Sequence, residues 1–233
     1  MKIGINCGHT VSGQPGTGAV GYLDESVETR EVGKRLMTLF RTAGHTVYDC
    51  TDDYAVSEND NLSKIVNLAN KQPLDLFVSI HFNSGGGRGT EVFTYGGSSF
   101  KEAENVCKAI ESAGFVNRGI KDGSSLYVIR RTNAKSMLIE VCFVDTSDAE
   151  IYKRIGAYAV AGAIFKGITG KEVTGMAAFK DIAGHYAETH IKDLQEMGIV
   201  NGDENGNFRP NDTITRADAA IMVRNAVRYI TGK

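Results

Sequence analysis

The sequence predicts an α/β fold: a three-layer domain with a mixed, mostly parallel central sheet flanked by helices, followed by a small C-terminal helical domain. Apolar strand-like runs alternate with helix-period segments through residues 1–168, which is the pattern of a layered α/β domain. Residues 169–176 lack an apolar period and contain two glycines, so we interpret them as a linker. Residues 177–233 then show helical periods only, which indicates a second domain with a small core.

Short apolar runs mark the predicted strands, and longer segments with an apolar residue every three or four positions mark the helices. The first helix carries such a stripe, formed by Val32, Leu36, Leu39 and Phe40. The predicted strands, in chain order, are residues 2–7, 46–50, 75–81, 90–95, 125–130 and 137–143. The predicted helices of the first domain lie near residues 25–43, 58–71, 99–114 and 147–167.

The C-terminal tail predicts a helix, a turn-rich loop and a second helix. The first helix is expected over residues 184–197, with Tyr186 and Leu194 on its inward face. The second helix is expected to begin after Thr215. Thr215 is a suitable N-cap, and Asp218 stands where a capping box places an acidic partner.

The composition indicates a globular chain, and its small net charge does not favour a highly charged partner. With 233 residues, of which 42% are hydrophobic, the chain can bury a substantial core. Its 26 basic and 28 acidic side chains leave a net charge of -2, so binding to nucleic acid or to an anionic membrane is not expected. The cysteines are far apart and form no C-x-x-C pair, so reduced and mostly buried thiols are expected at Cys7, Cys50, Cys107 and Cys142.

The first residues predict a protein made in the cytoplasm without a signal peptide. A strand is expected to begin at position 2, which leaves no room for the charged and apolar regions of a secretory signal. No apolar run approaches the length of a membrane span, so no membrane partner is expected. A target outside the membrane would then be reached after lysis or through a pore.

A carboxylate inside an apolar run gives the first indication of chemistry. Glu140 lies in the middle of residues 137–143, which are otherwise apolar. Burying a charge there is costly unless a partner compensates it. A bound metal ion is one such partner, and an arginine such as Arg130 is another.

Two histidines and a glutamate supply candidate ligands for a metal ion. His9 follows the first predicted strand and His81 ends the third. Open α/β sheets place ligands at the carboxyl ends of their strands, where both histidines are expected. Glu25 opens the first helix two turns before Val32, so it is expected to point inward. Glu28, nearer the edge of the same helix face, is the fallback ligand.

Two imidazoles and one carboxylate are the open three-ligand set of catalytic zinc, which lowers the pKa of a bound water towards about 7. Glu140 would then be the general base that takes the water proton and passes it to the leaving nitrogen. Asn83, two residues after His81 on the same strand face, is expected to hydrogen-bond substrate or a ligand. His45, between a helix and a strand, is interpreted as structural.

Each of these residues alone also fits a plainer role. A single histidine at a strand end is more often capped or solvated than bound to a metal. A glutamate at a helix N-terminus is favoured by the helix dipole without any ligand. The combination of His9, Glu25, His81 and Glu140 is what predicts a hydrolytic zinc site.

Four short motifs follow one another across the first domain: Gly8-His9, Asp24-Glu25-Ser26, S-I-H-F-N from Ser79 to Asn83, and L-I-E-x-x-F from Leu138 to Phe143. In this order they resemble the zinc-dependent N-acetylmuramoyl-L-alanine amidases of the amidase-3 type, found in bacterial autolysins and phage endolysins. The resemblance implies that His9, Glu25 and His81 hold Zn²⁺ and that Glu140 is catalytic. It also implies cleavage of the amide between N-acetylmuramic acid and the first L-alanine of the stem peptide in peptidoglycan.

The tail carries a second set of motifs, which are Phe179-Lys-Asp181, His185-Tyr-Ala187, Phe208-Arg-Pro210 and Ile214-Thr-Arg-Ala-Asp218. They resemble a single S-layer homology module, a class that binds secondary cell-wall polysaccharide. The resemblance assigns Arg216 to an anion contact, although a surface arginine is often only a solvated charge. Such modules commonly act in threes, so one copy leaves open whether the tail oligomerises or binds weakly as a monomer.

Together these features predict a peptidoglycan hydrolase that its C-terminal module concentrates on the cell wall. The expected route through lysis or a pore favours a phage or prophage endolysin, and a mother-cell autolysin is the close alternative. Two interpretations from other classes are a non-catalytic wall-binding protein with a decayed enzyme domain, and a zinc peptidase or deacetylase on a similar sheet. The bond that is cut in purified walls distinguishes them.

Overall fold

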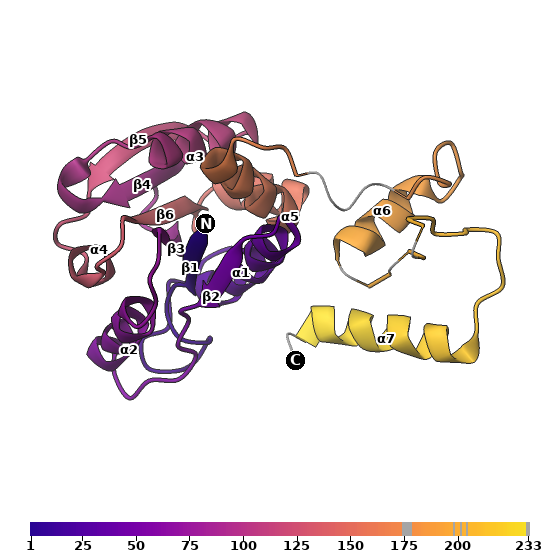
Figure 1. The fold of residues 1–233 in the computed structure, drawn as a ribbon, viewed down its shortest axis with the longest axis horizontal. Coiled ribbons are helices and arrows are strands. Elements are labelled where there is room, and N and C mark those ends of the chain that lie inside the picture. Colours follow the sequence, from indigo (N-terminus) through magenta and orange to yellow (C-terminus); the bar gives the residue numbers. More distant parts are fainter. Residues whose placement is uncertain (174–178, 198, 201, 204, 232–233) are drawn as a thin grey trace. The chain divides into compact units, whose positions relative to one another are not determined.

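The computed structural model divides the chain into two compact units, Met1–Val173 and Thr174–Lys233 (Figure 1). The parts of the chain that it describes are residues 1–173, 179–197, 199–200, 202–203 and 205–231. In those parts, none of the helices is both long enough and apolar enough to cross a membrane.

A six-stranded sheet forms the middle of the first unit (Figure 1). Its strands lie in the order β2-β1-β3-β6-β4-β5, and neighbours are parallel except for the antiparallel pair β4 and β6. The predicted mixed, mostly parallel sheet is therefore confirmed. The strands are β1 (Lys2–Cys7), β2 (Thr46–Asp49), β3 (Leu76–Asn83), β4 (Thr90–Thr94), β5 (Asn117–Asp122) and β6 (Ser136–Phe143).

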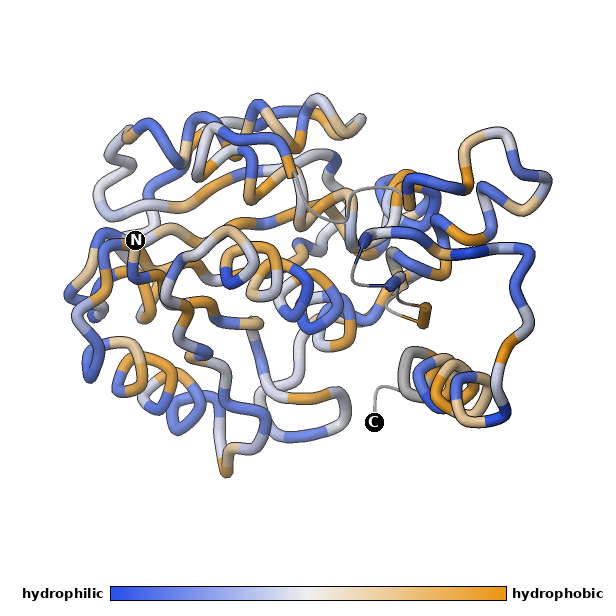
Figure 2. The backbone as a smooth tube through the Cα atoms, turned by 45° about the vertical axis from the view of Figure 1, so that its right-hand side comes forward, coloured by the Kyte–Doolittle hydropathy of each residue, from blue (hydrophilic) through white to orange (hydrophobic). Residues whose placement is uncertain are grey.

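Helices cover both faces of this sheet and complete the predicted three layers. One face carries α1 (Glu25–Thr42), α3 (Lys101–Ser112) and α5 (Asp148–Thr169), and the other carries α2 (Glu58–Asn70) and α4 (Tyr127–Arg131). Leu36 and Ile164 belong to the buried apolar cluster of the first face, and Ile65 and Phe77 belong to that of the second. Figure 2 shows hydrophobic colour along the strands and alternating colour along the helices, as expected when one side of each helix is buried.

One predicted strand is wrong and one observed strand is not predicted. Residues 125–130 were expected to be a strand, but Tyr127–Arg131 form α4, which packs against α2 and buries Val128. Tertiary packing thus outweighs the β propensity of this segment. The unpredicted strand is β5, whose sequence N-R-G-I-K-D is mostly polar. It lies at the edge of the sheet and, among the described strands, pairs with β4 alone, so it needs no continuous apolar run.

The predicted linker, residues 169–176, overlaps the end of α5. That helix ends at Thr169, and Gly170 caps it in the left-handed conformation with φ of 70°. Residues 174–176 of the predicted linker lie outside the described residues.

The described part of the second unit contains two helices, α6 (Glu188–Glu196) and α7 (Arg216–Thr231), and a small core. Its core combines five buried apolar residues, Phe179, Ile182, Ile191, Ile199 and Val200. The predicted N-cap of the second helix is confirmed: the backbone N–H of Asp218 donates to Thr215 Oγ1 at 3.1 Å, and the Thr215 hydroxyl donates to the Asp218 carboxylate at 2.6 Å.

The first helix of this unit is shorter than predicted. It begins at Glu188 rather than near residue 184. Gly184 has φ of 76° and donates its N–H to the Glu188 carboxylate, so the chain turns before the helix begins. Tyr186 therefore lies outside the helix and is 93% exposed, and its predicted inward position is wrong.

Candidate metal centre

Two neighbouring parallel strands bring His9 and His81 together at one edge of the sheet. β1 and β3 pair with Cys7 beside Ile80, so His9 just beyond β1 lies next to His81 within β3. The centroids of the two imidazole rings are 4.8 Å apart, with the rings inclined at 71°. The prediction that both histidines meet at the carboxyl ends of their strands is thus reproduced by the structure.

The turn that carries His9 is held in an unusual conformation. His9 has φ of 63°, in the left-handed region that side chains other than glycine rarely adopt. The guanidinium of buried Arg30 holds the turn by donating to the carbonyl oxygens of Gly8 at 3.1 Å and His9 at 2.9 Å, and it pairs with Asp53 at 2.8 Å. A Cβ atom at Gly8 would lie 2.4 Å from the His81 ring, so only glycine allows this close approach.

Glu25 is the third member of the cluster. Its Oε1 lies 3.1 Å from His9 Nε2 and 3.2 Å from His81 Nδ1. Backbone N–H groups fix the carboxylate, because Phe82 donates to Oε1 at 3.0 Å and Ala19 donates to Oε2 at 2.9 Å. Glu25 is buried at the first position of α1, as its place in the helix stripe predicts.

The three side chains shift one another's pKa values. Burial acts to raise the pKa of Glu25, but hydrogen bonds and charge from the two histidines outweigh it, so this pKa lies well below its ordinary value. Burial lowers the pKa of His81 despite its hydrogen bond to Glu25, whereas the same carboxylate overcomes burial and raises the pKa of His9. At neutral pH the metal-free cluster therefore offers an ionised Glu25 and a neutral His81, the protonation states in which these groups bind metals. The raised pKa of His9 means that metal binding would displace a proton from this imidazole.

The geometry and the donor types fit a zinc ion. The ligand atoms of His9, Glu25 and His81 all lie within 4.8 Å of one another. The His9 side chain is 29% exposed, so the cluster can be reached from solvent. Two imidazoles and one carboxylate match an open catalytic zinc site. Glu28, the fallback ligand, instead accepts a hydrogen bond from Tyr152 at 2.7 Å and does not join the cluster.

Glu140 lies beside the cluster on the next strand. The register pairs His81 with Glu140 and Glu140 with Glu91, so these side chains form a row on one face of the sheet. Burial, together with the charges of Glu25 and Glu91, raises the pKa of Glu140 to about 8. Its Oε2 is buried without a hydrogen-bond partner among the described residues, which fits a group that acts on an ion, water or substrate. Arg130 does not compensate it, because its guanidinium points to carbonyl oxygens of a turn.

Two charged residues of this edge, Glu91 in β4 and Arg118 in β5, are not predicted from the sequence. Buried Glu91 accepts hydrogen bonds from Arg118 Nε at 2.7 Å and from Asn83 Nδ2 at 2.8 Å. Asn83 therefore lies at the predicted edge, with its Oδ1 accepting from the Ser84 N–H at 2.8 Å. Glu91 carries the same signal as Glu140, a carboxylate inside a strand, whereas Arg118 lies in the strand that the apolar pattern does not reveal.

The other predicted site residue, Arg216, belongs to the second unit. It is the first residue of α7, next to the Thr215 cap, and it is exposed. Exposure leaves its guanidinium accessible to an anionic ligand. Its role remains a prediction. His45, interpreted as structural, lies outside the cluster and contacts the N-terminal amino group through Nδ1 at 3.0 Å.

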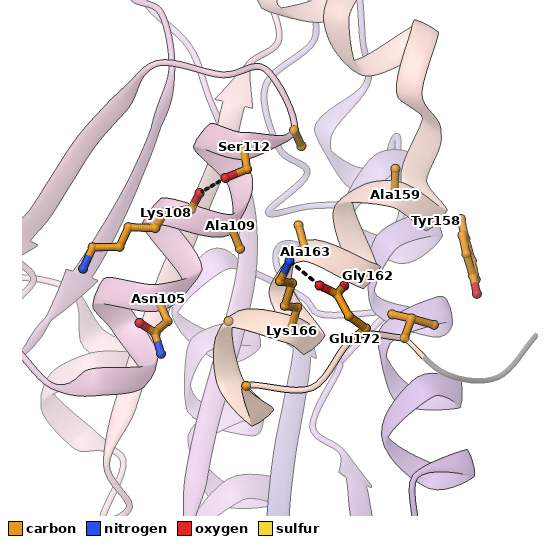
Figure 3. Close-up of a pocket in the computed structure, with 14 residues that line it drawn as sticks. Asn105, Lys108, Ala109, Ser112, Tyr158, Ala159, Gly162, Ala163, Lys166 and Glu172 are labelled. Atoms are coloured by element: carbon orange, nitrogen blue, oxygen red, sulfur yellow. Dashed lines mark hydrogen bonds and ion pairs between the residues drawn. The ribbon is translucent and has the colours of Figure 1, made fainter.

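A groove between α3 and α5 has a different character from the cluster (Figure 3). Small residues such as Ala109, Gly162 and Ala163 line it. Two of its polar groups are engaged locally, because Lys166 pairs with Glu172 and Ser112 donates to a carbonyl oxygen within α3 (Figure 3). None of the residues of the metal cluster lines this groove, so the candidate chemistry lies at the sheet edge.

Comparison with known families assigns both units. A family model described as N-acetylmuramoyl-L-alanine amidase matches residues 3–170. A model described as S-layer homology domain matches residues 178–220. The first match contains every residue of the metal cluster together with Glu140, and the second contains Arg216.

Individual relatives agree with these matches. An uncharacterised protein of Clostridium perfringens is 31% identical over 216 residues, which are 89% of this chain and 63% of that protein. The sporulation-specific N-acetylmuramoyl-L-alanine amidase of Bacillus subtilis is 33% identical over 161 residues, with 66% of this chain and 60% of the relative covered. The chain spans about three fifths of the length of the curated relatives it matches.

Solved structures reproduce the fold of the first unit. The catalytic domain of an endolysin that targets Clostridium difficile has a TM-score of 0.67 at 28% identity, and the match covers 74% of this chain and 98% of that chain.

Proposed function

Because the chain belongs to the N-acetylmuramoyl-L-alanine amidase family, we propose that it hydrolyses the amide between N-acetylmuramic acid and the L-alanine of the stem peptide in bacterial peptidoglycan. One observation carries the proposal above all others. A single carboxylate oxygen of Glu25 lies 3.1 Å and 3.2 Å from nitrogens of His9 and His81, next to Glu140 with its unpartnered oxygen. An open metal site beside a buried carboxylate is an arrangement that supports metal-assisted amide hydrolysis.

His9, Glu25 and His81 would hold Zn²⁺. When bound, the ion supplies polarisation of the scissile carbonyl and lowers the pKa of a water. Burial raises the pKa of Glu140 in the metal-free fold, and the charge of a bound cation would favour its ionised form. Ionised Glu140 accepts the proton of the attacking water and delivers it to the nitrogen of the leaving L-alanine. Asn83 keeps one Nδ2 hydrogen beyond its bond to Glu91, and we propose that it donates this hydrogen to substrate.

The second unit supplies attachment to the wall in this proposal. The S-layer homology match supports binding to secondary cell-wall polysaccharide, with Arg216 as the anion contact. Holding the enzyme on its substrate raises the effective concentration without any new catalytic contact. Ile221, Val223 and Ile230 of α7 are more than half exposed, and packing them against further copies of the module would give oligomerisation through the tail.

We propose a role as a phage or prophage endolysin, which the match to the endolysin catalytic domain supports. A mother-cell autolysin is the second candidate, and the match to the sporulation-specific amidase of Bacillus subtilis supports it. Both roles use the same chemistry and act at the cell wall.

The decisive experiment is digestion of purified sacculi by the zinc-loaded protein, followed by mass spectrometry of the products. The proposal expects intact stem peptides with a new L-alanine amino terminus and intact glycan strands. Shortened stems would indicate a peptidase and loss of acetyl groups a deacetylase. Walls that are bound but chemically unchanged would indicate a non-catalytic binding protein. Chelator-treated protein is the control, because binding through the second unit should survive the loss of zinc.

A further inference from the structure

An arginine lies at the end of the row of carboxylates beside the metal centre. Arg118 comes from the edge strand β5, and its Nε donates to Glu91 Oε2 at 2.7 Å. Its guanidinium also lies over the ring of Phe143, 5.2 Å from the ring centroid. A carboxylate and an aromatic face thus hold the side chain in one position.

The position of Arg118 leaves part of its guanidinium available. Its side chain is 38% exposed, whereas that of Glu91 is 7% exposed. Among the described residues, none accepts a hydrogen bond from its two terminal amino groups. These groups can bind a second anion while Nε stays on Glu91, because a guanidinium presents five donors in a fixed plane.

The order of the strands tells which part of the substrate reaches Arg118. The metal ligands lie on β1, β3 and the adjoining α1, Glu140 lies on β6, and Glu91 and Arg118 follow on β4 and β5. In the proposed reaction Glu140 protonates the leaving nitrogen, so this nitrogen lies on the Glu140 side of the metal ligands, and we infer that the stem peptide continues in the same direction. That direction leads across β4 towards Arg118.

The distances agree with the second residue of the stem. Neighbouring strands lie about 5 Å apart, and a peptide advances about 3.5 Å per residue. Arg118 reaches back to Glu91, so its guanidinium lies over β4, one strand beyond Glu140. One strand spacing beyond the leaving nitrogen corresponds to the second residue of the stem. In peptidoglycan this residue is a glutamate whose α-carboxyl group is either free or amidated.

We propose that Arg118 binds the free α-carboxylate of the second stem residue, so that the enzyme selects acidic over amidated stems. This inference rests on the proposed amidase function and names a specificity-determining residue for it. Glu91 is the positioning residue that keeps the guanidinium beside Glu140. A purely structural arginine, present only to neutralise Glu91, would not distinguish the two substrates.

The test compares two N-acetylmuramoyl pentapeptides that differ only in this group, one with a free α-carboxylate and one with a carboxamide. Parent protein and the variants Arg118→Gln and Arg118→Lys, all full length and zinc-loaded, are assayed for kcat and KM on both. We expect the parent to have a KM at least about tenfold lower for the acid, as for a charge-assisted hydrogen bond. Arg118→Gln should raise KM for the acid only, and Arg118→Lys should keep part of the preference.

Controls keep the result interpretable. Arg35→Gln removes another arginine that pairs with a glutamate, on α1, and should leave the acid-to-amide ratio unchanged. Zinc content and thermal melting establish that each variant is folded.

An equal KM for the two substrates in the parent, or the same preference in Arg118→Gln, would overturn the assignment of Arg118. Failure to cut either pentapeptide while purified walls are still hydrolysed would also overturn it. An enzyme that recognises the second residue of one stem should cut a substrate that contains a single stem. If purified walls release no L-alanine amino termini, the proposed amidase function fails instead.

Discussion

The two units of the chain differ in whether their apolar and candidate functional side chains are buried or exposed. In the first, helices cover both faces of the sheet. The candidate metal ligand Glu25 lies in α1, and the candidate base Glu140 lies in β6. Among the described residues of the second, five apolar residues form the buried core, and α7 exposes Ile221, Val223 and Ile230. Its candidate ligand residue, Arg216, is exposed as well.

This contrast separates two physical tasks. Hydrolysis needs charged groups in fixed positions and at perturbed pKa values, which a covered sheet provides by burial. Attachment to a polymer needs accessible charge and apolar surface, which a small module provides by leaving them uncovered. Variants in the first unit should therefore change chemistry, and variants in the second should change wall binding and local stability.

The largest effect is expected from His81→Ala. It removes one of two imidazoles in a three-ligand cluster, so stoichiometric zinc and hydrolysis of purified walls should both be lost. Elemental analysis and release of new amino groups measure the two losses. His45→Ala is the matched control, because His45 contacts the N-terminus rather than the cluster. Full zinc occupancy in His81→Ala would show that the cluster is not the metal site.

The next effect is expected from Glu140→Gln, which should keep zinc and lose about 10²- to 10⁴-fold in kcat. The carboxamide retains the shape of the side chain but cannot accept the proton of the attacking water. Glu102→Gln, at a glutamate on α3 that pairs with Lys135, serves as the control. Near-parental kcat in Glu140→Gln would remove Glu140 from the mechanism. The metal ligands would then be the remaining evidence that the first unit buries its catalytic residues.

Burial of Glu140 also predicts a pH effect on the stability of the zinc-free protein. Its pKa is raised from 4.5 to about 8 in the fold, so the folded state holds one more proton than the unfolded state between these pH values. The contribution of Glu140 to the free energy of unfolding should therefore fall as pH rises from about 4.5 to about 8. At pH 8, zinc-free Glu140→Gln should be more stable than the parent by about 1 to 3 kcal/mol. Urea unfolding at pH 5 and pH 8 measures this, and an equal difference at both would contradict it.

How far the sequence predicts the site depends on the kind of strand that carries each residue. His9 and His81 are predictable because apolar runs reveal their strands and parallel strands align their carboxyl ends. Glu25 is predictable because its place in a helix stripe fixes its direction. Arg118 is not, because β5 is a polar edge strand whose pairing follows from the order of the whole sheet.

Two other features of the structure that the sequence does not predict also depend on packing and on the order of the strands. The segment at residues 125–130 has β propensity, but packing against α2 makes part of it a helix. The proximity of Glu91 to Glu140 depends on the antiparallel placement of β4, which no local pattern specifies. Local signals thus predict which residues are unusual, whereas the sheet order decides which of them meet.

In the second unit, Arg216→Gln should weaken binding to purified secondary cell-wall polysaccharide by about tenfold, as for one lost charge-assisted contact. Hydrolysis of short soluble muramyl peptides should not change. A pull-down with purified walls and a solution assay separate the two readouts. Arg224→Gln, a second arginine of the exposed helix, is the control for general charge. Equal weakening by both variants would indicate a nonspecific charge effect at α7.

The smallest effect is expected from Thr215→Ala. The Thr215 hydroxyl caps α7 by accepting from the Asp218 N–H, and its loss should destabilise the helix by about 1 kcal/mol. Hydrogen exchange of the α7 amides in the full chain should show this loss, and Thr215→Ser should restore most of the protection. Zinc content and kcat on soluble substrate should stay at parental values, because the cap contributes nothing to the cluster. A change in either would show that the two units do not act separately, and the contrast between buried chemistry and exposed attachment would then have to be abandoned.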